Sequence, residues 1–124
     1  MTIFTKIING DIPCYKVAED ERFFAFLDIA PMTKGHTLVI PKFEADKESD
    51  YIFDMDDETY AGLMLFAKRV AKAIEAAVPC QRVGVAVMGM EVPHVHVHLI
   101  PMNSEKDMVI SNPKLKLEAS EMAE

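Results

Sequence analysis

The chain has 124 residues, half of them hydrophobic, and a formal net charge of −7. This length fits one domain with a single core, and the negative charge argues against a protein that grips DNA or RNA non-specifically. No hydrophobic run reaches the ~18 residues of a membrane span, and no secretory leader is apparent. Cys14 and Cys80 form no Cys-x-x-Cys motif, which argues against a zinc knuckle. We therefore expect a cytoplasmic protein that binds neither nucleic acid nor membrane.

The N-terminal half predicts three strands. Residues 15–28 contain two runs rich in aromatic and β-branched side chains, which favour strands, around a polar turn at 19–22. Residues 29–35 contain Pro and Gly and are typical of a connection. The run HTLVIP at 36–41 predicts the third strand.

Residues 57–78 predict a long helix, because hydrophobic side chains recur there at spacings of three and four. Asp56 or Asp57 can cap its start, where acidic groups also suit the positive end of the helix dipole. Pro79 lies just beyond the end, as expected of a helix stop signal.

Two more strands follow the helix, at 82–89 and at 94–100. Short turns between strands favour antiparallel pairing, so the fold class predicted is α+β, with about five antiparallel strands and one long helix on one side. We expect one domain over residues 1–103. Residues 104–124 are polar and predict a C-terminal tail or arm, or a short terminal helix.

The stretch EVPHVHVHLIP at 91–101 contains three of the four histidines, His94, His96 and His98. Alternate side chains of a strand share one face, so the three imidazoles form a row while the apolar residues between them point to the core. One such histidine is most simply a polar residue on a solvent-exposed face. Three in strict alternation indicate chemistry, because imidazole serves as base, acid, nucleophile and metal ligand near neutral pH.

Two kinds of chemistry use such a row. In a metal site, two of the three histidines bind one zinc ion, and His36 can add a further ligand. In phosphoryl transfer, a neutral imidazole attacks phosphorus, while neighbouring imidazoles stabilise the phosphate or protonate a leaving group. Composition alone leaves both hypotheses open.

Four segments together resemble the histidine triad (HIT) family of nucleotide hydrolases and transferases, in particular its small purine-nucleoside phosphoramidase branch. HVHVHLI at 94–100 matches the family signature His-φ-His-φ-His-φ-φ, where φ is apolar. The segments at 2–13, 19–31 and 35–42 resemble the family's N-terminal half in order and spacing. The resemblance covers residues 2–103 and implies an α+β domain that pairs into a homodimer.

The resemblance also implies a mechanism. His96 would attack the α-phosphorus of a purine nucleotide, and water would then hydrolyse the covalent nucleotidyl-histidine. His98 would contact the phosphate, and His94 would orient His96 through a hydrogen-bond network, with His36 behind it. The substrate would be a nucleoside phosphoramidate or a dinucleoside polyphosphate, and no cofactor would be required.

The resemblance also implies a nucleoside pocket. Asp28 matches the acidic residue that accepts hydrogen bonds from the ribose hydroxyls, although an aspartate at this place is also a turn former. The apolar wall around the base would consist of six residues that are otherwise ordinary core: Ile3, Phe4, Ile7, Phe26, Leu27 and Ile29.

Two features depart from the family pattern. Many members carry an N-terminal Cys-x-x-Cys that binds a structural zinc, and this chain has Thr2 and Thr5 there. Threonine does not replace a thiolate ligand, so we expect that zinc site to be absent. The segment before the triad is shorter than in the family and has Met90 at the place of a Gln. Each lost phosphate donor would lower the rate on the order of a hundredfold.

These departures leave two alternatives to the hydrolase. The chain would be a nucleotide-binding or regulatory module with weak catalysis if the missing donors are essential. It would be a metal-dependent hydrolase if the four histidines bind a metal.

Overall fold

The computed structural model describes residues 3–43, 51–90, 92–108 and 122. Its centre is one five-stranded sheet with the order β1-β2-β3-β5-β4, in which every neighbouring pair is antiparallel. The strands are β1 (Lys16–Glu19), β2 (Phe23–Leu27), β3 (Thr37–Pro41), β4 (Arg82–Ala86) and β5 (Val97–Met102). The predicted α+β fold is confirmed.

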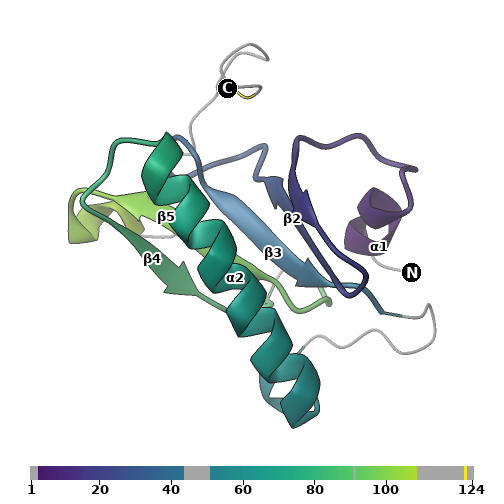
Figure 1. Ribbon diagram of the computed structural model, residues 1–124. Helices are drawn as coiled ribbons and strands as arrows, with labels where there is room; N and C mark the ends of the chain where they lie inside the picture. The colour runs from purple at the N-terminus through teal and green to yellow at the C-terminus, as the bar shows by residue number, and fades with distance from the viewer. Residues whose placement is uncertain (1–2, 44–50, 91, 109–121, 123–124) are drawn as a thin grey trace.

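Helix α2 (Asp57–Ala77) lies across one face of the sheet (Figure 1). Its start matches the predicted cap, because the Asp56 carboxylate accepts a hydrogen bond of 2.7 Å from the Thr59 N–H. That bond also lowers the pKa of Asp56. Within the described ranges, no helix is long and apolar enough to cross a membrane.

The described residues also form three shorter helices: α1 (Ile3–Ile8), η1 (Ile52–Asp54) and η2 (Glu105–Met108). The sequence did not predict α1, which packs against the opposite face of the sheet through its buried Phe4. Of the predicted tail at 104–124, the structure describes η2 and the buried Met122, and the rest lies outside the described residues.

The sheet is buried on both faces, because alternate residues of its central strands point to opposite sides. In β2, Phe23 and Ala25 pack under α2 with Leu63, whereas Phe24 and Phe26 pack with Phe4 on the other side. This two-sided burial explains why FFAFL reads as a continuous hydrophobic run rather than an alternating one.

The last two strands are shorter than predicted. β4 ends at Ala86, and β5 begins at Val97, so His94 and His96 precede the strand instead of lying in it. The alternation of faces nevertheless extends back to Val95, which packs in the core under α2 with Val97 and Leu99.

The core under α2 provides a matched test of the packing. Leu63 is completely buried and Leu65 is 57% exposed on the same helix. We expect Leu63→Ala to lower the free energy of unfolding by about 2–5 kcal/mol, because it leaves a cavity, and Leu65→Ala to change it by less than about 1 kcal/mol. Urea denaturation followed by circular dichroism measures both, and equal losses would contradict the assigned core.

Candidate active site

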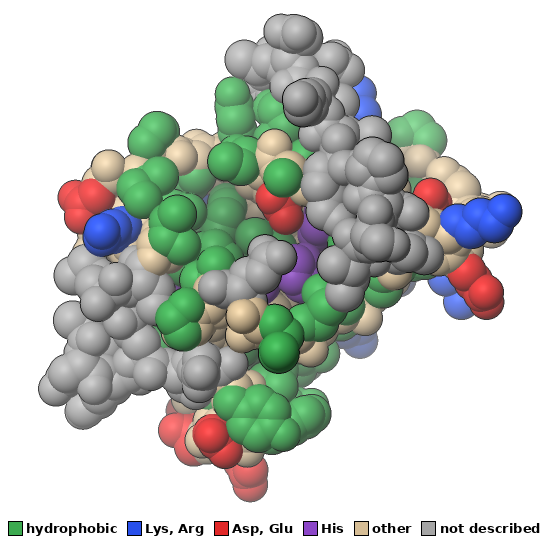
Figure 2. All heavy atoms as spheres, turned by 180° about the vertical axis from the view of Figure 1, so that it is seen from behind, with side chains coloured by type: hydrophobic (Ala, Val, Ile, Leu, Met, Phe, Trp, Pro, Cys, Tyr) green, Lys and Arg blue, Asp and Glu red, His purple; other side chains and the backbone are tan. Residues whose placement is uncertain are grey.

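The triad lies on the face of the sheet turned away from α2. His98 is opposite Leu38 in the β3–β5 register, and Leu38 belongs to the hydrophobic cluster formed with Phe4 of α1. Figure 2, which views this face, shows histidine side chains among hydrophobic ones. The predicted row of imidazoles on one side and core residues on the other is therefore present, although only His98 lies in a strand.

His96 is held by a main-chain oxygen. Its Nδ1 lies 2.7 Å from the carbonyl oxygen of His94. A carbonyl only accepts hydrogen bonds, so Nδ1 carries the proton and, in the neutral ring, Nε2 has the lone pair. The ring is 7% exposed and lies edge-on to Phe4, with their centroids 5.0 Å apart. His96 is thus fixed in the tautomer that a nucleophile attacking through Nε2 requires.

His94 is a buried anchor for this segment. Its Nε2 donates a hydrogen bond of 2.9 Å to the Pro41 carbonyl oxygen at the end of β3. Its ring packs against Phe4 and Phe43, with centroids 5.6 Å and 5.1 Å away. The contact between His94 and His96 is the hydrogen bond from the His96 ring to the main-chain carbonyl of His94.

His36 pairs with His98. Its Nε2 lies 2.9 Å from Nδ1 of His98 and 3.8 Å from Oδ2 of Asp28. On its other side, the Met32 N–H donates a hydrogen bond of 3.0 Å to Nδ1 of His36. The resemblance had placed His36 behind His94, and this hydrogen bond instead puts it beside the third histidine.

Asp28, His36 and His98 bring three possible ligand atoms within 4.8 Å of one another. A metal bound at Nε2 of His36 would need the lone pair of that atom. The Met32 N–H already uses the lone pair on Nδ1, so the neutral ring carries its proton on Nε2. This arrangement disfavours metal binding by the three residues.

The six residues predicted to surround the base fall into different environments. Phe4 and Phe26 are buried together in the cluster beside the histidines, and Ile7 packs against that cluster. Ile29 is 78% exposed, and Ile3 is also exposed. Leu27 alternates with Phe26 and therefore points to the α2 side, where it lines a cavity with Asp28 and His36.

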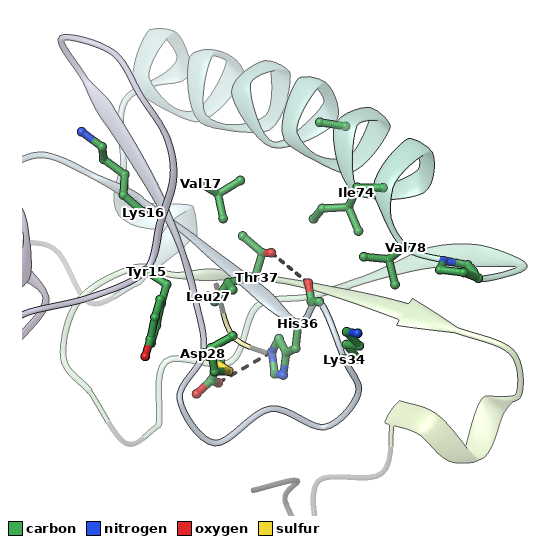
Figure 3. Close-up of a pocket in the computed structure, with 15 residues that line it drawn as sticks. Tyr15, Lys16, Val17, Leu27, Asp28, Lys34, His36, Thr37, Ile74 and Val78 are labelled. Atoms are coloured by element: carbon green, nitrogen blue, oxygen red, sulfur yellow. Dashed lines mark hydrogen bonds and ion pairs between the residues drawn. The ribbon is translucent and has the colours of Figure 1, made fainter. Parts of the chain in front are cut away.

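That cavity has a volume of about 560 Å³ and lies between the β2–β3 connection and the C-terminal end of α2 (Figure 3). Its lining includes Ile74 of α2, Val78 just after the end of that helix, and three residues that the sequence did not predict, Tyr15, Lys34 and Met122. Its size is in the range of small-molecule sites. A local sequence pattern cannot reveal Met122, because it is far along the chain from every other residue of the cavity.

Two more positions bear on the chemistry. Met90, at the place of the family's Gln, is 90% exposed, and its thioether has no N–H or O–H to donate to a phosphate. Cys14 packs against the cluster around Phe4, and burial raises the pKa of its thiol. A thiol that stays protonated is a poor nucleophile, so burial disfavours such a role for Cys14.

Comparisons with known proteins identify the family of this chain. The HIT domain model matches residues 9–105. The chain is 45% identical to the adenosine 5′-monophosphoramidase hnt1 of Schizosaccharomyces pombe over 106 residues, which are 84% of this chain and 76% of the relative. It is 42% identical to the adenosine 5′-monophosphoramidase HNT1 of Saccharomyces cerevisiae over 110 residues, which are 87% of this chain and 66% of the relative.

Solved structures show the same fold. A HIT family protein from Bacillus anthracis is 39% identical, with a TM-score of 0.77 over 91% of this chain and 81% of its own. A zinc-bound histidine triad family protein from Mycobacterium smegmatis is 32% identical, with a TM-score of 0.75 over 87% of this chain and 79% of its own. The sequence match, the fold and the row of histidines lead to one conclusion: the chain belongs to the HIT domain family.

Proposed function

We propose that this protein is a nucleotide hydrolase that cleaves purine nucleoside phosphoramidates at the α-phosphorus through a nucleotidyl-His96 intermediate. The observation that carries the proposal is the hydrogen bond from His96 Nδ1 to the His94 carbonyl, because it leaves the lone pair on Nε2. The two fungal relatives named as adenosine 5′-monophosphoramidases support the substrate class. A dinucleoside polyphosphate is the second candidate substrate.

The reaction proceeds in two displacements. First, the Nε2 lone pair of His96 forms a bond to the α-phosphorus while the phosphorus–nitrogen bond of the substrate breaks. The leaving amine keeps that electron pair and takes a proton from solvent. A water oxygen then attacks the phosphorus, the bond to Nε2 breaks and returns its electron pair to the ring, and the water releases a proton. The net products are the nucleoside monophosphate and the amine.

Asp28 and His98 are the proposed substrate contacts beside the nucleophile. Asp28 Oδ1 accepts a hydrogen bond of 2.9 Å from the Ala30 N–H, which fixes the carboxylate at the end of β2. In the proposed complex, its Oδ2 accepts hydrogen bonds from the ribose hydroxyls. His98 donates to a phosphate oxygen, and the side chains of Phe4 and Ile7 contribute to an apolar wall for the purine.

The short segment before the triad favours a second candidate function, a nucleotide-binding module with weak catalysis. The exposed Met90 cannot replace the amide donor that the family places there. A panel of phosphoramidates and dinucleoside polyphosphates separates the two functions. Micromolar AMP binding by calorimetry without turnover of any of these substrates would favour the binding module.

We propose that neither a structural zinc nor a catalytic metal is needed. Thr5 is a buried residue of α1, and a threonine hydroxyl is a poor zinc ligand compared with a thiolate. Thr2 lies outside the described residues. Hydrolysis that survives exhaustive chelation supports this proposal, and stoichiometric zinc in protein purified without added metal contradicts it.

We also propose that the protein forms a homodimer and that it is cytoplasmic. β4 is an edge strand of the described sheet, and its Val85 is exposed. An exposed apolar edge is commonly protected by pairing. Sedimentation equilibrium at micromolar concentration distinguishes a dimer from a monomer.

Replacing the nucleophile tests the mechanism. We expect His96→Ala to lower kcat for adenosine 5′-monophosphoramidate by at least about a thousandfold, because no other group forms the covalent intermediate. The exposed Leu65→Ala variant is the control and should hydrolyse the substrate at the parent rate. A His96→Ala protein that folds normally and retains parental kcat would refute the assignment.

Asp28 should determine the preference for ribose. The carboxylate is expected to accept hydrogen bonds from ribose hydroxyls, so the parent should favour the ribonucleoside phosphoramidate over its 2′,3′-dideoxy analogue by about 10–100-fold in kcat/KM. Asp28→Asn keeps an oxygen for the Ala30 N–H and should remove most of this preference. If the ratio of the two substrates is unchanged in Asp28→Asn, ribose does not contact this side chain.

A further inference from the structure

The hydrogen bonds around His36 have a direction that reaches His98. A main-chain N–H only donates, so Nδ1 of His36 must accept the bond from Met32. The neutral His36 ring therefore has its proton on Nε2, and this proton is donated to Nδ1 of His98. His98, in turn, carries its own proton on Nε2. One amide of the main chain thus fixes the tautomers of two imidazoles in series.

The connection that supplies this amide is itself held in place. Between β2 and β3, the Asp28 N–H donates to the His36 carbonyl at 3.0 Å, which closes the connection at its base. The Thr33 hydroxyl donates a hydrogen bond of 2.8 Å to the Pro101 carbonyl of β5. Gly35 has a φ of +91°, and a Cβ there would lie 2.9 Å from Val78. These constraints hold the Met32 amide against His36.

We propose that His36 is a positioning residue whose function is to keep His98 as a neutral hydrogen-bond donor through Nε2. His36 is almost completely buried and lies between the Met32 amide and His98, so it acts through His98. The catalytic meaning of this proposal rests on the proposed hydrolase function.

The consequence for the substrate follows from the charge of the phosphoryl group. An imidazole that presents an N–H stabilises the phosphoryl oxygens, whereas one that presents a lone pair repels them. Without the donor from His36, a neutral His98 ring populates both tautomers. Only the tautomer with its proton on Nε2 can donate a hydrogen bond to a phosphoryl oxygen. His36 therefore excludes the unproductive form before the substrate arrives.

A matched pair of substitutions tests the proposal. In His36→Gln, the terminal amide reaches about as far as Nε2 and can still donate to His98, whereas His36→Met has a similar shape and no donor. Both variants lack the imidazole, so a difference between them reports the effect of the N–H that donates to His98. Nitrogen-15 NMR of the histidine rings, without substrate, reports which nitrogen of His98 carries the proton.

We expect the parent and His36→Gln to have His98 protonated on Nε2, and His36→Met to show a mixture of the two tautomers. The His96 tautomer, fixed by the His94 carbonyl, should be the same in all three proteins. For adenosine 5′-monophosphoramidate, kcat should fall at least about tenfold further in His36→Met than in His36→Gln. A single unchanged His98 tautomer in a folded His36→Met protein would overturn the proposal.

The main-chain donor is tested at Met32. Met32→Pro removes the N–H, and Met32→Ala keeps it. We expect the rings of His36 and His98 to become mixed in tautomer in Met32→Pro and to stay as in the parent in Met32→Ala. If Met32→Pro is folded by circular dichroism and keeps both parental tautomers, the Met32 amide does not set them. These NMR results do not depend on turnover. A protein that hydrolyses no substrate would refute the hydrolase function, whereas the NMR spectra would still show which nitrogen of His98 carries the proton.

Discussion

The burial of Val95, Val97 and Leu99 under α2 is the constraint on which the candidate site depends. These side chains hold the backbone of the histidine segment against the sheet, so the residues between them must face the other side. The main-chain carbonyl of His94 is thereby fixed next to His96, and the carbonyl sets the tautomer of that ring. Packing on one face of the sheet thus fixes the hydrogen bonding of a histidine on the other.

The site is organised mainly by main-chain groups. Carbonyl oxygens accept from His94 and His96, and an amide N–H donates to His36. Such partners do not titrate and cannot exchange the roles of donor and acceptor, so each imidazole is kept in one tautomer. The carboxylate of Asp28 lies at the side of the network, where it is 3.8 Å from Nε2 of His36. Main-chain partners for the histidines, with the carboxylate to one side, suit a site in which neutral imidazoles act on an anionic substrate.

The sequence predicted the sheet, α2 and the four histidines as candidate site residues. Hydrophobic spacing indicates strands and helices, and the strict alternation of three histidines indicates a site. The sequence failed for α1, since a six-residue helix is marginal alone and depends on the packing of Phe4. It placed the start of β5 too early because side chains already alternate between the two faces from Val95 onward, whereas ladder pairing with β3 begins only at Val97. The pairing of His36 with His98 depends on strand register, which one sequence does not specify.

The central claim is that Nε2 of His96 forms a covalent bond to the nucleotide. Rapid acid or detergent quenching of the protein during turnover of adenosine 5′-monophosphoramidate, followed by peptide mass spectrometry, measures this bond directly. We expect a nucleotidyl adduct on the peptide that contains residues 94–98, located at His96 and lost on longer incubation. Turnover with no adduct at any quenching time, or an adduct on His98 instead, would contradict it.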